Sequence, residues 1–99
     1  MKSAIFYKPD PIIPVEDIDL LPPQKGEVLV KLSAAGVCHS DHHFMTGHFT
    51  PTRAPFGMGD EGAGLISEIG QDVKGVKPGD KVIFSMDSMC GKCMNCILG

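Results

Sequence analysis

Three cysteines near the end of the sequence impose the strongest constraint on how this chain can fold. Cys90, Cys93 and Cys96 are spaced three residues apart, and Gly91 follows the first of them. Short C-x-x-C steps in a glycine-containing loop aim successive side chains at one point, as tetrahedral thiolate coordination requires. The spacing therefore predicts a zinc-knuckle loop over residues 90–99, with Cys90, Cys93 and Cys96 as zinc ligands.

This loop leaves several alternatives open. A closed structural zinc site has four ligands, so the fourth either follows Gly99 in a longer protein, of which this chain is a fragment, or is the upstream Cys38. An iron–sulfur cluster uses the same spacing, but the further cysteine and proline of a ferredoxin-type site would lie beyond Gly99; zinc is the preferred interpretation. The N-terminal residues contain no apolar leader, so we expect a cytoplasmic protein without disulfides.

Short strands separated by turns account for most of the remaining chain. Residues 27–37 show the clearest period of two, with Val28, Val30, Leu32 and Ala34 on one face. The 12 glycines and 8 prolines favour turns over long helices. The sequence predicts a mainly β fold, an antiparallel β-barrel or sandwich. Its expected elements are strands at 2–7, 12–20, 27–37, 63–69 and 80–85, a helical turn at 37–43 capped by Ser40 or Asp41, and a loop at 44–55.

Composition excludes two classes of partner. The net charge is −3 and the lysines and arginines form no basic stripe, so we expect no nucleic acid partner. No apolar run approaches the length of a membrane span, so we expect no membrane partner. The run Gly57-Met-Gly-Asp-Glu-Gly62 matches a dinucleotide fingerprint, but a proline-bearing loop precedes it and a β-rich stretch follows, which is the wrong context for a nucleotide site.

A second chemical cluster follows the strand at 27–37. Cys38 is succeeded by His39, Ser40, Asp41, His42 and His43. A lone cysteine is commonly a small buried hydrophobe, and a run of histidines is commonly a solvated turn. A thiolate beside imidazoles and a hydroxyl is equally compatible with a metal ligand and a proton path. Spacing alone leaves both interpretations open.

Four motifs taken together resemble the zinc-dependent medium-chain alcohol dehydrogenases. They are Gly36-Val-Cys-His-Ser-Asp41, then Gly59-Asp-Glu-Gly-Ala-Gly64 with Gly70, then Gly79-Asp-Lys-Val82, then the run from Cys90 to Cys96. The resemblance covers essentially all 99 residues and implies a GroES-like antiparallel β-barrel. Residues 1–99 would then be the N-terminal part of the catalytic domain, cut within the structural zinc loop, with the Rossmann domain absent.

The resemblance also implies a role for individual residues. Cys38 resembles a ligand of the catalytic zinc, and Cys90, Cys93 and Cys96 resemble the ligands of the structural zinc. Ser40 resembles the hydroxyl that takes the proton of the substrate alcohol, and His43 the imidazole that passes it to solvent. His39 occupies the place of a basic residue facing the phosphates of the cofactor. Asp41 and Glu61 resemble carboxylates that orient the metal ligands.

One position departs from the family pattern. The histidine ligand of the usual Gly-His-Glu motif is replaced by Asp60. A carboxylate can bind zinc, so we expect Asp60 to be a ligand; the alternative is that Glu61 binds the metal or that no metal is present. An added anionic ligand neutralises more of the metal's charge, which predicts weaker alkoxide stabilisation or a preference for harder ions.

The expected function follows from this resemblance. The full-length protein would be a zinc-dependent alcohol dehydrogenase that uses NAD or NADP and oxidises a small alcohol to an aldehyde or ketone by alkoxide formation and hydride transfer. We expect it to be a homo-oligomer, and the 99-residue chain alone to be inactive. The alternatives are a non-enzymatic, zinc-stabilised interaction module and a metal-independent reductase on the same scaffold.

Overall fold

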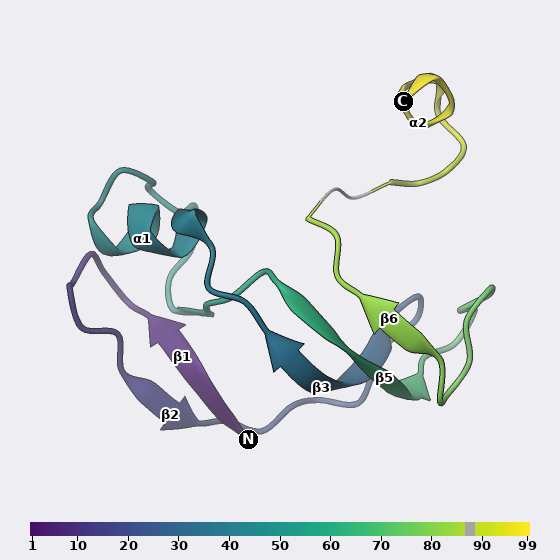
Figure 1. The fold of residues 1–99 in the computed structure, drawn as a ribbon, viewed down its shortest axis with the longest axis horizontal. Coiled ribbons are helices and arrows are strands. Elements are labelled where there is room, and N and C mark those ends of the chain that lie inside the picture. Colours follow the sequence, from purple (N-terminus) through teal and green to yellow (C-terminus); the bar gives the residue numbers. More distant parts are fainter. Residues whose placement is uncertain (87–88) are drawn as a thin grey trace.

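The computed structural model describes residues 1–86 and 89–99, which contain two small antiparallel sheets and two short helices (Figure 1). Each sheet has three strands, in the orders β2-β1-β4 and β3-β5-β6. The prediction of a mainly β fold with antiparallel pairing is confirmed. The elements in chain order are β1 (Lys2–Phe6), β2 (Val15–Asp17), β3 (Val28–Ala35), α1 (His39–Met45), β4 (Phe56–Gly57), β5 (Gly62–Ile69), β6 (Lys81–Ile83) and α2 (Met94–Leu98).

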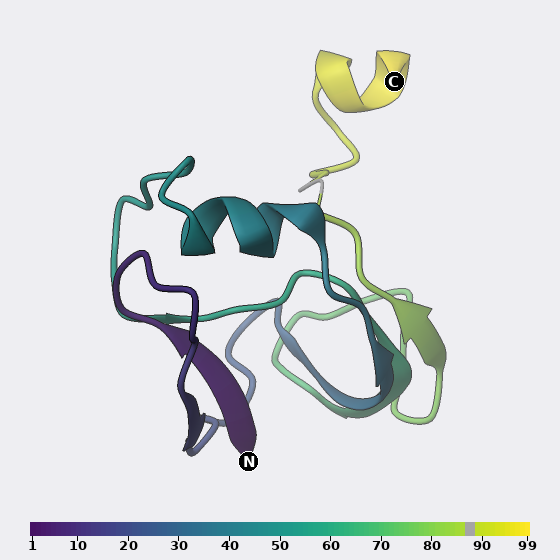
Figure 2. The same ribbon diagram turned by 60° about the vertical axis from the view of Figure 1, so that its left-hand side comes forward.

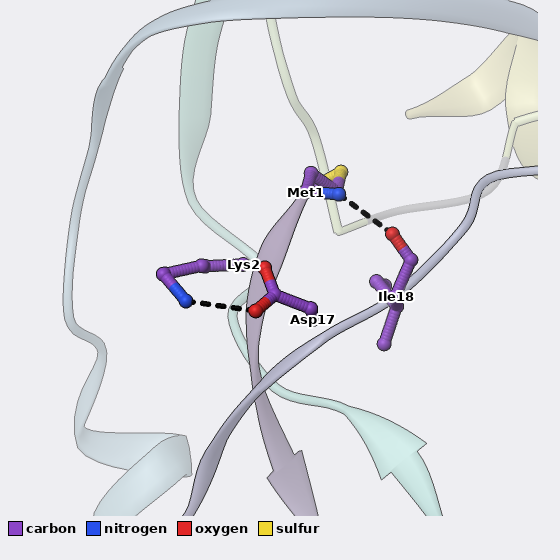
Figure 3. Close-up of polar contacts among 4 residues, drawn as sticks. All are labelled: Met1, Lys2, Asp17 and Ile18. Carbon is purple, nitrogen blue, oxygen red and sulfur yellow. Dashed lines mark hydrogen bonds and ion pairs between the residues drawn. The ribbon is translucent and has the colours of Figure 1, made fainter.

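Contacts of the N-terminal residues link β1 to β2 in the first sheet. The amino group of Met1 donates a hydrogen bond of 2.6 Å to the carbonyl of Ile18, and Lys2 Nζ lies 2.9 Å from Asp17 Oδ2 (Figure 3). The two side chains of the ion pair are 71% and 76% exposed, so water screens the pair and it contributes little to stability. Backbone pairing, in which Ala4 lies opposite Val15, therefore sets the register.

Aromatic packing attaches α1 to the first sheet. Phe6 on β1 is only 1% exposed, and its ring centroid lies 5.1 Å from that of Phe56 and 5.8 Å from that of Phe44 on α1. Phe44 also meets Phe56 edge-on at 5.3 Å. Such tilted and edge-on contacts are favourable beyond the area they bury. This aromatic cluster holds the helix that follows Cys38 against β1 (Figure 2).

The second sheet depends on a close approach at Gly64. Gly64 lies in the central strand β5, opposite Leu32 of β3 and Val82 of β6. A Cβ atom built on Gly64 would collide with the backbone carbonyl of Lys31, which cannot move without disturbing the β3–β5 pairing. Glycine at this position therefore allows the two strands to pair.

We expect Gly64→Ala to lower the free energy of unfolding by about 1–3 kcal/mol, the usual cost of forcing atoms into a packed site. Gly57→Ala is the matched control. Its added Cβ would meet only the Ser3 hydroxyl, at 3.3 Å, and that side chain can rotate away. Urea denaturation of both variants measures the difference. Equal losses in the two variants would show that the close approach at Gly64 is unimportant.

Several elements differ from the sequence prediction. The capping prediction was wrong: the helix begins at His39 with Cys38 as the N-cap, and it continues through Met45 into the expected loop. Phe44 extends the helix because its ring packs on Phe6. Strand β4 and helix α2 were not predicted, since elements of 2 and 5 residues are too short for periodicity to reveal.

The alternation expected along residues 27–37 is interrupted in the structure. Register shifts separate Leu29 from Val30 and Leu32 from Ala34 in the pairing with β5. Val28 and Leu32 remain 39% and 45% exposed, and the buried hydrophobic residues among those described are Ile5, Phe6 and Ile66. A bulge adds an unpaired residue to one strand and re-aims the side chains after it. None of the helices in the described ranges is long and apolar enough to cross a membrane.

Candidate functional site

Helix α1 carries four of the residues that the sequence singled out, and a fifth, Cys38, stands at its N-terminus. Cys38 is the N-cap, with the extended conformation that this position requires (φ −89°, ψ 155°). Its backbone N–H donates to Asp41 Oδ2 at 3.1 Å, and the N–H of Asp41 donates to the carbonyl of Cys38 at 3.1 Å. Asp41, at the third position of the helix, therefore accepts the backbone N–H of the N-cap residue, as the acidic residue of a capping box does. The result is that Cys38 is held at the start of the helix.

The structure brings Cys38 together with Asp60 and Glu61. One ligand atom from each of these three residues lies within 4.8 Å of the other two. Cys38 comes from the N-terminus of α1, whereas Asp60 and Glu61 come from the loop between β4 and β5. The N–H of Gly36 donates to the carbonyl of Glu61 at 3.2 Å, and the absence of a Cβ at Gly36 leaves room for the Glu61 carboxylate. A thiol and two carboxylates thus converge.

The carboxylate of Asp60 is only half satisfied. Ser40 Oγ donates a hydrogen bond of 2.9 Å to Asp60 Oδ2, which links helix α1 to the loop. Asp60 Oδ1 is buried, and no described residue gives it a hydrogen bond. A buried acceptor without a partner costs free energy. A divalent cation would satisfy the free oxygen and neutralise the charge, so the donor set fits zinc.

His43 lies in the same helix, three residues after Ser40, so the two side chains belong to one face of α1. Partial burial, and then the neighbouring His39, His48 and His42, hold the pKa of His43 below its ordinary value of 6.5. The imidazole is therefore neutral at neutral pH, as a proton acceptor must be. The ring of His39 meets that of His43 edge-on, with centroids 4.7 Å apart.

Beside these residues the structure has a cavity of about 370 Å³. Its walls are mainly apolar, and Asp41 and Glu61 supply its acidic groups. The apolar contributors include Met45 of α1, Met58 of the β4–β5 loop and Phe84 after β6. Sequence reasoning did not find them, because single apolar residues from separate elements leave no pattern in the sequence. His42, which the sequence analysis left without a role, lies beside His39 and His43 and was detectable from its helical spacing.

Cys90, Cys93 and Cys96 form a second, separate cluster. The sulfur of Cys96 lies 3.8 Å from that of Cys90 and 3.4 Å from that of Cys93. The backbone N–H groups of Lys92 and Cys93 donate to Cys90 Sγ at 3.5 and 3.3 Å and lower the pKa of Cys90 from 9.0 to about 7. Cys38 groups with Asp60 and Glu61, not with these three cysteines.

The chain is similar to a family of known domains. The family described as "Alcohol dehydrogenase GroES-like domain" matches residues 24–99. The S-(hydroxymethyl)glutathione dehydrogenase of Photobacterium damsela subsp. piscicida is 42% identical over 98 residues. That match covers 99% of this chain but 27% of the relative, so the chain spans about a quarter of the length of the curated relatives it matches.

Solved structures show the same fold. The cobalt- and zinc-bound thermostable alcohol dehydrogenase from Pyrobaculum aerophilum superposes with a TM-score of 0.87 at 32% identity, over 100% of this chain and 30% of that one. The benzyl alcohol dehydrogenase from Acinetobacter calcoaceticus superposes with a TM-score of 0.84 at 34% identity, over 99% and 26% respectively. The likeness extends over the whole of the present chain, and it agrees with the GroES-like fold expected from the motifs.

Proposed function

The chain belongs to the alcohol dehydrogenase GroES-like domain family, and from this premise we propose that it is the N-terminal part of a zinc-dependent, NAD(P)-linked alcohol dehydrogenase. The full-length protein oxidises a small alcohol to an aldehyde or ketone. The observation that carries the proposal is the convergence of Cys38, Asp60 and Glu61, with a free buried oxygen on Asp60. Residues 1–99 supply the metal ligands and proton-handling groups, and the nicotinamide-binding domain belongs to the remainder of the full-length protein.

Zinc bound at this cluster would supply Lewis-acid polarisation of the substrate oxygen. The residues of the chain hold and orient the reacting groups. Cys38 and Asp60 are the ligands we assign from this chain, and Glu61 lies against them with its position set by Gly36. Asp60 stands where the Gly-His-Glu motif of the family resemblance has a histidine, so a carboxylate would replace a neutral ligand in this site.

Proton movement is assigned to Ser40 and His43. Ser40 gives its own proton to the hydrogen bond with Asp60, so its lone pairs remain free to accept the hydroxyl hydrogen of a substrate. When Ser40 Oγ takes the substrate proton, its own proton leaves the hydrogen bond to Asp60 and passes to His43, whose pKa partial burial holds below its ordinary value; His43 then releases a proton to water. His39, at the exposed start of α1, is assigned to the phosphates of the nicotinamide cofactor. The structural zinc is assigned to Cys90, Cys93 and Cys96.

The direct test is alcohol oxidation by the full-length protein, followed by the appearance of reduced nicotinamide. We expect activity with a primary or secondary alcohol, loss of activity on chelation and recovery when zinc is restored. Activity that survives complete removal of metal would instead favour a metal-independent reductase. Zinc-loaded protein with no activity toward alcohols or aldehydes would favour the non-enzymatic module.

Replacing the unusual ligand gives a second test. We expect Asp60→His in the full-length protein to raise zinc affinity and to move the pH–rate profile to lower pH, because a neutral ligand leaves more positive charge on the metal. Asp19→His is the control, because it makes the same chemical change at an exposed position. We expect it to change neither the zinc affinity nor the pH–rate profile. Metal-competition titration and kcat measured against pH provide the two readouts. An unchanged profile in Asp60→His would count against ligation by Asp60.

A further inference from the structure

Three imidazoles gather on one side of α1. His39, His42 and His43 are separated by three and four positions, so the rings of His42 and His43 both neighbour that of His39. The ring centroids of His39 lie 5.3 Å from His42 and 4.7 Å from His43, and those of His42 and His43 lie 6.4 Å apart. One ring nitrogen from each of the three lies within 4.8 Å of the other two. This arrangement is called the histidine trio below.

The histidine trio has an unsatisfied member. His43 Nδ1 is buried, and no described residue forms a hydrogen bond with it. A buried ring nitrogen without a partner is costly, and a bound ion is one way to satisfy it. His39 and His42 are exposed, so an ion from solvent can reach the group without opening the fold. Nitrogens that each lie about 2.0–2.1 Å from one metal ion are closer together than 4.8 Å, so the exposed rings of His39 and His42 would rotate toward the ion as it binds.

We propose that His39, His42 and His43 form a third metal site, which binds a late divalent transition-metal ion such as Ni²⁺, Cu²⁺ or Zn²⁺. All the donors are imidazole nitrogens, which suit these ions and do not suit Mg²⁺ or Ca²⁺. The site is distinct from the Cys38–Asp60–Glu61 cluster and from the cysteine loop, with which it shares no residue. It goes beyond the function proposed above, in which no histidine of this chain binds metal and His42 has no part.

The chain also offers a matched control. The ring of His48 lies 5.4 Å from that of His43, in the same aromatic neighbourhood. Its Nδ1 is engaged by the Thr46 hydroxyl at 2.9 Å, and it is not a member of the histidine trio. His48→Gln therefore removes an adjacent imidazole from outside the proposed site, whereas His42→Gln removes one from inside it.

The experiment uses the full-length protein, first loaded with two equivalents of zinc per chain, so that the two cysteine-containing sites are filled and no zinc is left over for the histidine trio. NiCl₂ is then titrated at neutral pH and followed by calorimetry, with NMR of the histidine rings. We expect one further equivalent of Ni²⁺ per chain, with paramagnetic broadening of the rings of His39, His42 and His43. His42→Gln should weaken this binding by about tenfold or more, and His48→Gln should leave it unchanged.

Two results would overturn the proposal. One is an absence of nickel binding beyond the zinc content, or binding that His42→Gln leaves intact. The other is an equal loss in His42→Gln and His48→Gln, which would indicate a diffuse histidine surface. The titration does not depend on turnover or on Asp60, so its failure would leave the dehydrogenase proposal standing. Failure of the dehydrogenase assay would likewise leave the nickel result intact.

Discussion

Replacing Cys38 with serine in the full-length protein is expected to abolish one metal site and to reduce kcat by more than about 100-fold. Removal of a residue that only supports a metal ligand typically costs 10- to 100-fold in affinity or activity, and Cys38 is proposed to be a ligand itself. The hydroxyl of serine is a poorer zinc donor than a thiolate, which is the form of cysteine that binds metal. Metal analysis and steady-state kinetics on the same preparation measure both effects.

The fold should survive this change. Serine is close to cysteine in size and Cys38 is only partly buried, while the contacts that cap α1 use its backbone. We therefore expect an unchanged circular dichroism spectrum and a similar Tm in metal-free protein. A Cys38→Ser variant with its full metal content and normal kcat would refute the assignment of the catalytic site. If the variant loses activity because it unfolds, its circular dichroism spectrum will change; loss of the metal site alone will leave the spectrum unchanged.

Removing zinc from the cysteine loop, by chelation or by Cys93→Ser, is expected to unfold residues 89–99 while the sheets persist. Helix α2 has 5 residues and none of them is buried, far fewer than the roughly 12–15 that an isolated helix needs in water. Both ribbon views place α2 apart from the sheets (Figures 1 and 2). Structural zinc binding is worth about 10–16 kcal/mol in small peptides, so the metal is the dominant constraint on this segment.

Amide hydrogen exchange measures this effect segment by segment. We expect protection in residues 89–99 to disappear without zinc, and protection in β1, β3 and β5 to change little. Cys38→Ser is the control, since it should lose the other metal and keep this segment ordered. Persistent protection of α2 in metal-free Cys93→Ser would show that packing, rather than metal, holds the loop.

The same loop should respond to pH. The pKa of Cys90 is lowered from 9.0 to about 7 by the backbone N–H groups around its sulfur. Because the thiolate is favoured in the folded loop, the depressed pKa stabilises the loop fully at pH values above 9.0. This stabilisation is lost as the pH falls through about 7. Acidification therefore destabilises residues 89–99, as chelation does, because protonated thiols do not bind zinc.

Much of the fold was predictable because its signals are local. The strand at residues 2–7 was expected from alternation, and those at 63–69 and 80–85 from β-rich stretches next to glycine and proline turns; each range overlaps a strand of the structure. The boundaries of α1 were wrong because they depend on distant contacts. Phe44 continues the helix only because Phe6 and Phe56 lie beside it. The register shifts between β3 and β5 arise from the pairing of the two strands, which alternation along one strand does not reveal.

Part of the candidate site was likewise predictable from local sequence, and part depended on distant contacts. Cys90, Cys93 and Cys96 converge because their spacing and the positive φ of Gly91 turn the backbone locally, so sequence was sufficient to expect the cluster. The meeting of Cys38 with Asp60 and Glu61 joins residues more than twenty positions apart, and the sequence anticipated it only through the family resemblance. The hydrogen bond from Ser40 to Asp60 was not anticipated at all, although both residues had been singled out.

The sequence by itself determined the chemical groups of this protein, the positions of most strands and the local geometry of the cysteine loop, because these depend on residue type and on neighbours within a few positions. The tertiary structure decided which groups that lie far apart in the chain share a site. It left one oxygen of Asp60 and one nitrogen of His43 buried without a hydrogen-bond partner among residues 1–86 and 89–99, and it separated Cys38 from the other cysteines. Whether a side chain is buried, and which hydrogen-bond partner it finds, depends on segments that strand pairing and aromatic packing bring together. The order of residues along the chain does not show this.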